Sequence, residues 1–177
     1  AVLLRMKGAR VDDVERACVA VAALCRRAGA LVLVHTHAHL VARCGLHGAH
    51  LDARIDGQRA RVDEARLAMP RGALLGCSRH AGDRLDREAL AGFDYATLSP
   101  VFAPRSKPDD TRAPLGLAGL ASAVRASSLP VIALGGVDAS NARTCIDHGA
   151  RGVAVLGAIM SAHDPHAALA LMRAELS

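Results

Sequence analysis

A chain of 177 residues, of which 51% are apolar, is long enough to bury the core of one domain, and we expect a single domain over residues 1–177. No apolar run approaches the ~20 residues of a membrane span, and the first residues lack the sustained apolar stretch of a signal peptide, so we expect a cytoplasmic protein that makes no membrane contact. The net charge of +5 suits anionic ligands. With one tyrosine, two phenylalanines and no tryptophan to stack on bases, nucleic acid is not an expected partner.

Apolar runs of strand length alternate with amphipathic, helix-like segments along the chain. Strands are predicted over residues 2–6, 31–35, 48–51, 74–78, 95–98, 131–134 and 152–156. Helices are predicted over residues 11–28, 38–44, 58–69, 83–91, 117–126, 141–148 and 165–176. Parallel strands that are each followed by a helix imply a doubly wound sheet or a (β/α) barrel, and functional loops after several successive strands favour the barrel.

The last two predicted strands are each followed at once by small residues. Gly135 and Gly136 follow the first of these strands, and Gly157 and Ala158 follow the second. The polar segment between the strands has the length of one crossover helix, so both glycine sites lie at the carboxyl ends of adjacent parallel strands. In an α/β barrel, backbone N–H groups at that edge often hold a phosphate. A plain turn is the alternative for each pair.

Lysine is scarce in this chain. Of 22 basic residues only Lys7 and Lys107 are lysines, which favours a requirement for a compact ammonium group at those two places, with chance as the alternative. Lys107 falls in the longest predicted loop, residues 99–116, whose polar residues favour an anion-binding lid. A solvated surface loop is the alternative.

Histidines are concentrated between His35 and His80. His35, His37 and His39 alternate, and in an extended segment they would share one side, an arrangement that can bind a transition metal. The chain is expected to turn from strand into helix there, so no metal site is predicted. His80 lies two residues beyond Ser78 at a strand end and is a candidate for acid/base chemistry. The five cysteines have no metal-like spacing and are expected to be reduced core residues.

Several of these runs together resemble the thiamine phosphate synthase family and its relatives, the TenI-like thiazole tautomerases. The runs are GCSRH, DYATLSPVFAPRSKPD, PLGLAGL, LPVIALGGV and GARGVAVLGAI, preceded by LLRMK and LVLVHTHAHLVARCGLHGAHL. The resemblance implies a (β/α)8 TIM barrel. The family's first βα unit has no counterpart in this chain, so a gap or another segment is expected between the strands at residues 2–6 and 152–156.

The resemblance also implies a reaction, in which hydroxymethylpyrimidine diphosphate is coupled to thiazole phosphate with release of pyrophosphate. The expected partners are therefore small phosphorylated substrates. The implied residues are Arg5 and Lys7 for the pyrimidine or its diphosphate, Ser78 at a strand end, Ser106 and Lys107 for the pyrophosphate, and Gly136, Gly157 and Ala158 for the thiazole phosphate. In the predicted site, Ser78, Lys107 and His80 are the catalytic candidates.

The resemblance implies Mg²⁺ as well, but its ligands are not matched. The family's Asn-Asp pair is His35-Thr36 here, and its next acidic residue is Ile55, with Asp52 and Asp56 only nearby. Imidazole holds Mg²⁺ poorly. We therefore expect a thiamine phosphate synthase-like enzyme without the family's metal ligands. The alternatives are a TenI-like isomerase and a catalytically silent phosphate-binding module, and the sequence leaves the oligomeric state open.

Overall fold

The computed structural model describes residues 1–52, 59–103 and 112–177. Contacts divide these residues into two compact units. Unit 1 comprises Ala1–Ser78 with Ala91–Asp94, and unit 2 comprises Arg79–Leu90 with Tyr95–Ser177. The single-domain prediction stays a prediction.

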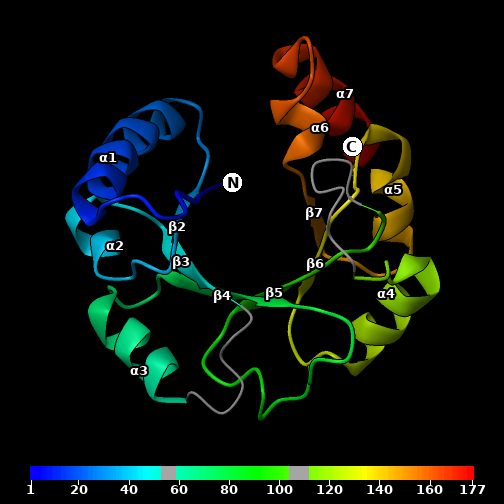
Figure 1. Ribbon diagram of the computed structural model, residues 1–177, viewed down its shortest axis with the longest axis horizontal. Coiled ribbons are helices and arrows are strands. Elements are labelled where there is room, and N and C mark those ends of the chain that lie inside the picture. Colours follow the sequence, from blue (N-terminus) through cyan, green and yellow to red (C-terminus); the bar gives the residue numbers. More distant parts are fainter. Residues whose placement is uncertain (53–58, 104–111) are drawn as a thin grey trace. The chain divides into compact units, whose positions relative to one another are not determined.

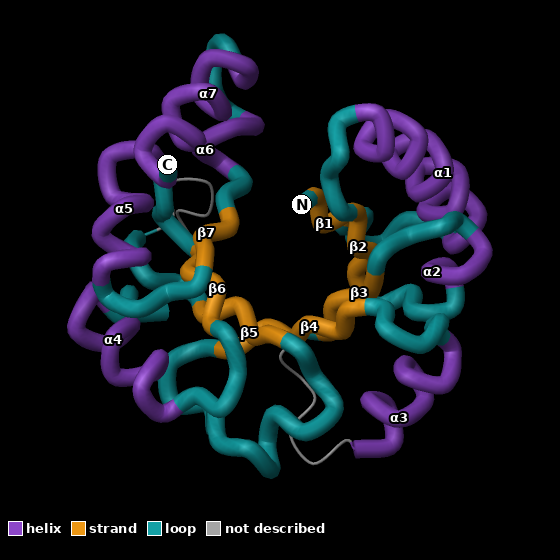
Figure 2. Tube along the Cα trace, turned by 180° about the vertical axis from the view of Figure 1, so that it is seen from behind, coloured by secondary structure: helices purple, strands orange, loops and turns teal. Residues whose placement is uncertain are grey.

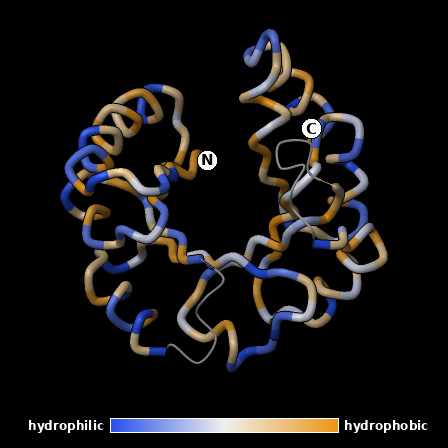
Figure 3. The backbone as a smooth tube through the Cα atoms, viewed as in Figure 1, coloured by the Kyte–Doolittle hydropathy of each residue, from blue (hydrophilic) through white to orange (hydrophobic). Residues whose placement is uncertain are grey.

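Unit 1 is a layer of parallel strands with helices on one face (Figures 1 and 2). Its strands pair in chain order and are β1 (Val2–Leu4), β2 (Val32–His35), β3 (Gly48–Leu51) and β4 (Leu74–Arg79). Its helices are α1 (Val11–Arg27), α2 (Leu40–Arg43) and α3 (Arg59–Ala68). Apolar and polar residues alternate along α1 (Figure 3), as expected for a helix with one buried side.

Side chains alternate between the two faces of the unit 1 strands. One set of alternating positions is apolar and buried, namely Val32, Val34, Ala49, Leu51, Leu75 and Cys77. The other set carries His35, His50 and Ser78 near the carboxyl ends of the strands. The strand layer thus has an apolar face and a face with chemically active side chains.

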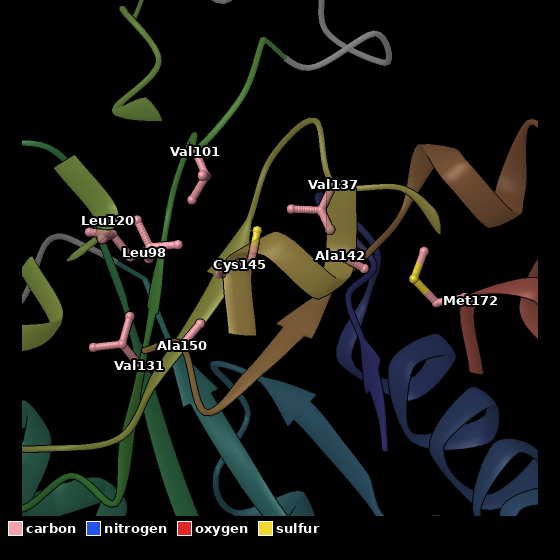
Figure 4. Close-up of a cluster of buried hydrophobic side chains, with 10 residues drawn as sticks. Leu98, Val101, Leu120, Val131, Val137, Ala142, Cys145, Ala150 and Met172 are labelled. Atoms are coloured by element: carbon pink, nitrogen blue, oxygen red, sulfur yellow. The ribbon is translucent and has the colours of Figure 1, made fainter. Parts of the chain in front are cut away.

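Unit 2 repeats this plan. Its parallel strands are β5 (Tyr95–Leu98), β6 (Val131–Leu134) and β7 (Gly152–Ala154), and its helices are α4 (Gly116–Ala126), α5 (Ala139–Asp147), α6 (Gly157–Met160) and α7 (Pro165–Leu176). A core packs between strands and helices (Figure 4); it includes Leu98, Val131, Ala133, Leu120, Ala142, Cys145 and Met172. Asp138 caps α5 in a capping box with Asn141.

The strands of each unit follow one another in chain order. This order is found in a (β/α) barrel and also within each half of a doubly wound sheet. The α/β class and the parallel pairing are confirmed. The described residues supply seven strands, and the closed eight-stranded barrel stays a prediction.

Most predicted elements have their ends within two residues of the observed ones. The strand predicted at residues 152–156 ends at Ala154, because its neighbour β6 ends opposite it and turns away at Gly135, where φ is 90°. The strand predicted at residues 2–6 ends at Leu4, which pairs with Val34 of β2.

The helix predicted at residues 83–91 is wrong, because this segment forms turns. The Asp86 carboxylate accepts hydrogen bonds from the N–H groups of Glu88 and Ala89, at 3.0 Å each, and the Leu85 carbonyl accepts one from Ser128. Hydrogen bonds to the Asp86 side chain and from Ser128 thus take the place of the backbone hydrogen bonds of the predicted helix.

All five cysteines are buried thiols, as expected. Burial raises the pKa of the Cys18 thiol to about 11 and also raises the pKa of Cys44 and Cys145. In the described part of the chain, no helix combines the length and the apolarity that crossing a membrane would require.

Gly48 is a position where the pairing of β3 and β4 allows no side chain. A Cβ there would lie 2.1 Å from the Leu74 carbonyl oxygen, so we expect Gly48→Ala to lower the free energy of unfolding by about 3 kcal/mol or more. Gly152 begins β7, and its Cβ would meet only the Cδ1 end of Ile132, at 3.3 Å. Gly152→Ala is therefore the matched control, with a cost of about 1 kcal/mol or less. Urea unfolding followed by circular dichroism measures both, and equal costs would contradict the close approach of β3 and β4.

Candidate functional site

The strand register of unit 1 brings chemically active side chains together at the carboxyl edge of its strands. His35 of β2 lies opposite His50 of β3, and His50 lies opposite Gly76 of β4, two residues before Ser78. The two imidazole rings stack with centroids 6.3 Å apart. Arg5, just after β1, acts electrostatically on both histidines. We call Arg5, His35, His50 and Ser78 the histidine–serine edge.

His50 and Ser78 form a hydrogen-bonded pair inside this edge. The His50 Nε2 atom lies 2.9 Å from the Ser78 Oγ atom, and His50 is only 2% exposed. Burial first, and then the charges of His35 and Arg5, lower the pKa of His50 to about 4. His50 is therefore neutral at pH 7, so either Ser78 donates to the ring nitrogen or the ring N–H donates to Ser78.

The turn after His35 is tight and strained. Thr36 has a φ of 64°, in the left-handed region that a β-branched residue rarely occupies and that costs about 1–3 kcal/mol. The Thr36 hydroxyl donates to the His35 carbonyl at 2.6 Å, and its Oγ1 lies 3.2 Å from His35 Nδ1, while the Thr36 N–H donates to the His50 carbonyl at 2.9 Å. These contacts orient the His35 ring. Backbone strain of this kind is typical of binding and catalytic sites.

The electrostatic environment of the histidine–serine edge is positive. Burial and then Arg5 lower the pKa of His35, while Asp52 opposes this shift. Asp52 itself lies 3.8 Å from the Arg61 guanidinium. Arg5 acts on both imidazoles, and its guanidinium favours an anion beside them.

The described residues at this edge do not fit Mg²⁺. They offer two imidazoles, a guanidinium and hydroxyl groups, whereas Mg²⁺ requires hard oxygen ligands such as carboxylates. Asp52 is the nearby carboxylate, and it is ion-paired with Arg61. Across residues 1–52, 59–103 and 112–177, no three His, Cys, Asp or Glu side chains gather as metal ligands would. Ile55 and Asp56 lie outside the described residues.

Unit 2 carries the predicted phosphate cup at the corresponding edge of its own strands. Because Leu134 lies opposite Ala154, the residues that follow β6 and β7 begin side by side. Gly136 lies in the turn after β6, and Gly157 and Ala158 are the first residues of α6. Their N–H groups are the ones that a helix cannot pair with its own carbonyls, and the N–H groups of Ile159 and Met160 already donate to Leu156.

Gly135 and Gly136 also have a packing role that the sequence did not suggest. A Cβ on Gly135 would lie 2.7 Å from Pro100 Cα, and one on Gly136 would lie 2.7 Å from the Ala103 carbonyl oxygen. Both residues have positive φ values. The glycine pair is therefore required for packing of the segment after β5, independently of any ligand.

The segment after β5 is fixed at both of its ends by backbone hydrogen bonds. The N–H groups of Val101 and Phe102 donate to the carbonyls of Leu134 and Gly135, and those of Leu115 and Gly116 donate to Pro100 and Val101, at 2.9 to 3.0 Å. We call these four bonds the loop stem. Ser106 and Lys107, which lie between its two sides in the chain, are outside the described residues.

His80 belongs to unit 2, where its contacts are with the end of β5. Its Nδ1 lies 2.7 Å from the Ser99 carbonyl oxygen and 2.8 Å from Arg112 Nη1. Arg112 Nη1 lies 2.9 Å from Nε2, and the backbone N–H of His80 donates to Asp83 at 2.7 Å. These contacts hold the ring in place, and an acid/base role of His80 stays a prediction.

The structure thus brings together some predicted residues and adds one that sequence reasoning missed. Arg5 and Ser78 lie at the histidine–serine edge, and Lys7 is exposed in the turn after β1. His50 was not among the candidates. Its signal was its place in the GLHGAHL run, at the end of a strand next to the one that carries Ser78.

Comparisons with known proteins agree on one family. A family model described as thiamine monophosphate synthase matches residues 1–159. The chain is similar to the thiamine-phosphate synthase of Methanoculleus marisnigri, with 38% identity over 96% of this chain and 78% of the relative. It is also similar to that of Thioalkalivibrio sulfidiphilus, with 38% identity over 92% of this chain and 75% of the relative.

Solved structures show the same fold. Thiamine phosphate pyrophosphorylase from Pyrococcus furiosus superposes with a TM-score of 0.79 at 24% identity, over 98% of this chain and 81% of that chain. A 3-hexulose-6-phosphate synthase from Salmonella typhimurium has a TM-score of 0.66 at 17% identity, over 90% of this chain and 79% of that chain.

We expect acid to destabilise the protein through His50. Between the unfolded pKa of 6.5 and the folded pKa of about 4, the unfolded chain binds a proton that the folded chain excludes, so stability is lost as the pH falls through this window. The loss is about 3 kcal/mol. Urea unfolding across this range should show a smaller pH dependence in His50→Gln. Replacement of the exposed His163 by Gln is the control and should leave the parental dependence intact. An unchanged slope in His50→Gln would contradict burial of a neutral ring.

Proposed function

Since the chain belongs to the thiamine monophosphate synthase family, whose members act in thiamine biosynthesis, we propose that it joins hydroxymethylpyrimidine diphosphate to thiazole phosphate and releases pyrophosphate. The family match over most of the chain carries this proposal. The arrangement of donors at the strand ends supports it. The closed eight-stranded barrel of the family belongs to the same proposal.

In the proposed reaction, unit 1 binds the diphosphate end of the pyrimidine substrate. Arg5 and Lys7 supply cations near the end of β1, and Ser78 supplies a hydroxyl that His50 holds in place at 2.9 Å. The leaving pyrophosphate gains negative charge as it departs, and cations and N–H donors fixed in advance stabilise that charge more than the ground state. The resemblance assigns Ser106 and Lys107, which lie outside the described residues, to pyrophosphate.

Unit 2 binds the thiazole phosphate in this proposal. Gly157 and Ala158 are the first residues of α6, and the first N–H groups of a helix have no carbonyl of the same helix to donate to. The Gly136 carbonyl accepts a hydrogen bond from Asn141 Nδ2 at 3.0 Å. In the trans Gly136–Val137 peptide the N–H is opposite to the carbonyl, so the Val137 N–H points away from Asn141. The phosphate is held on N–H dipoles and needs no cationic side chain.

A second candidate is a TenI-like isomerase or a catalytically silent phosphate-binding module. The donor set of the histidine–serine edge, which does not fit Mg²⁺, favours it. These proteins would keep the phosphate cup and lack the coupling reaction.

Mixing the two thiamine precursors with the protein should yield thiamine phosphate and pyrophosphate. Ser78→Ala should lower kcat/KM by about 10- to 100-fold, because one hydrogen bond to a charged group contributes about 1.5–3 kcal/mol. Ser122 is an exposed serine on α4, and Ser122→Ala should retain the parental rate. Binding of thiazole phosphate without any product, in the presence or absence of Mg²⁺, would instead support the second candidate.

Thiazole phosphate binding tests the cup directly. Gly157→Val should abolish binding by calorimetry, because its Cβ branch fills the space in front of the α6 N–H groups, while Arg173→Ala in the last turn of α7 should bind normally. Gly136→Val is unsuitable here, since its side chain would collide with Phe102 and Ala103 whether or not a phosphate binds. Unchanged affinity in a folded Gly157→Val variant would remove the cup from this edge.

A further inference from the structure

The side chains of the histidine–serine edge are hydrogen-bond donors and cations, and they do not suit Mg²⁺. We infer that this chain binds the diphosphate group of its substrate at this edge without a divalent cation, with His35 and Arg5 supplying the positive charge and Ser78 a hydroxyl donor. The inference rests on the proposed function, and it departs from the family, which is generally Mg²⁺-dependent.

The geometry supports an anion at this edge. His35, His50 and Ser78 occupy the same face of neighbouring strands, and Arg5 follows β1 at the position that continues the register opposite His35. In place of the Asn-Asp pair that the resemblance implies, the chain has an imidazole and a threonine whose hydroxyl is already bonded to the His35 carbonyl. The edge therefore offers donors and cations where a magnesium site needs oxygen acceptors.

His50 acts as a positioning residue in this arrangement. An anion in contact with Ser78 selects the proton arrangement in which His50 Nε2–H donates to Ser78 Oγ, because the Ser78 O–H is then directed to the anion. A buried neutral imidazole serves this purpose, since it fixes the hydroxyl without adding a titrating charge at neutral pH.

His35 supplies the adjustable charge. The groups that act on it are Arg5 after β1, His50 on β3, Asp52 after β3 and His37 in its own turn. In the free protein, burial and then Arg5 lower the pKa of His35, which favours the neutral imidazole. A diphosphate beside the ring reverses this balance and favours the imidazolium, whose N–H groups donate to the anion.

Calorimetry with inorganic pyrophosphate tests the inference. The parent should bind pyrophosphate in EDTA, and saturating Mg²⁺ should not tighten binding. His35→Gln and Arg5→Met should each weaken binding in EDTA by about tenfold or more, the effect of losing one charge-assisted hydrogen bond, and His163→Gln should not. No binding in EDTA, binding about tenfold tighter with Mg²⁺, or parental affinity in both variants would each overturn the inference.

Thr36 allows a matched test by gain of metal. Asp and Asn both suit a φ of 64° better than Thr, so Thr36→Asp and Thr36→Asn should fold at least as stably as the parent, which thermal unfolding checks. Thr36→Asp adds a carboxylate, so pyrophosphate binding should weaken in EDTA by about tenfold and recover with Mg²⁺. Thr36→Asn should stay insensitive to Mg²⁺. Mg²⁺ dependence in Thr36→Asn as strong as in Thr36→Asp would overturn the inference.

The binding and coupling experiments separate this inference from the proposed function. Metal-independent pyrophosphate binding without formation of thiamine phosphate would leave the inference standing and refute the synthase activity. Formation of thiamine phosphate together with pyrophosphate binding that requires Mg²⁺ would confirm the synthase activity and refute the inference.

Discussion

The parallel register of β2, β3 and β4 determines which side chains meet at the strand ends of unit 1. His35 lies opposite His50, and His50 opposite Gly76, so alternate residues of three strands share a face with Ser78. A shift of β3 by one residue would turn His50 toward the helices and bring Ala49 to the active face. The close approach of Gly48 to Leu74 disfavours such a shift, because no other residue fits at that point of the pairing.

This arrangement uses interactions that stability alone would not select. A buried imidazole lowers stability in acid, and Thr36 adopts a backbone conformation that suits its residue type poorly. The surrounding apolar face, which includes Val34, Ala49 and Cys77, supplies burial that offsets these costs. In a fold that is otherwise locally consistent, destabilising features that gather at one edge are typical of a binding site.

Hydrophobic periodicity was sufficient to predict the strands and most helices, because their buried faces repeat at the spacing of each element. It failed at residues 83–91, where the Asp86 side chain and Ser128 pair with the backbone in ways that periodicity does not encode. The place of Gly136, Gly157 and Ala158 directly after β6 and β7 was also predictable, since small residues after strands are a local signal, and their role in binding phosphate stays a prediction. The His50–Ser78 pair was not, because it depends on the register of β3 with β4, between residues 28 positions apart in the chain. For the same reason the packing of Gly136 against Ala103 could not be predicted.

The loop stem has a consequence for protein engineering. Its four hydrogen bonds involve only backbone atoms of residues 100–102, 115–116 and 134–135, so they do not depend on which side chains lie between its two sides. Sequence libraries that vary or lengthen the segment between Ala103 and Arg112 therefore retain the same anchoring frame, and loop closure costs grow only slowly with added length. This part of the chain is suited to recombination among homologues.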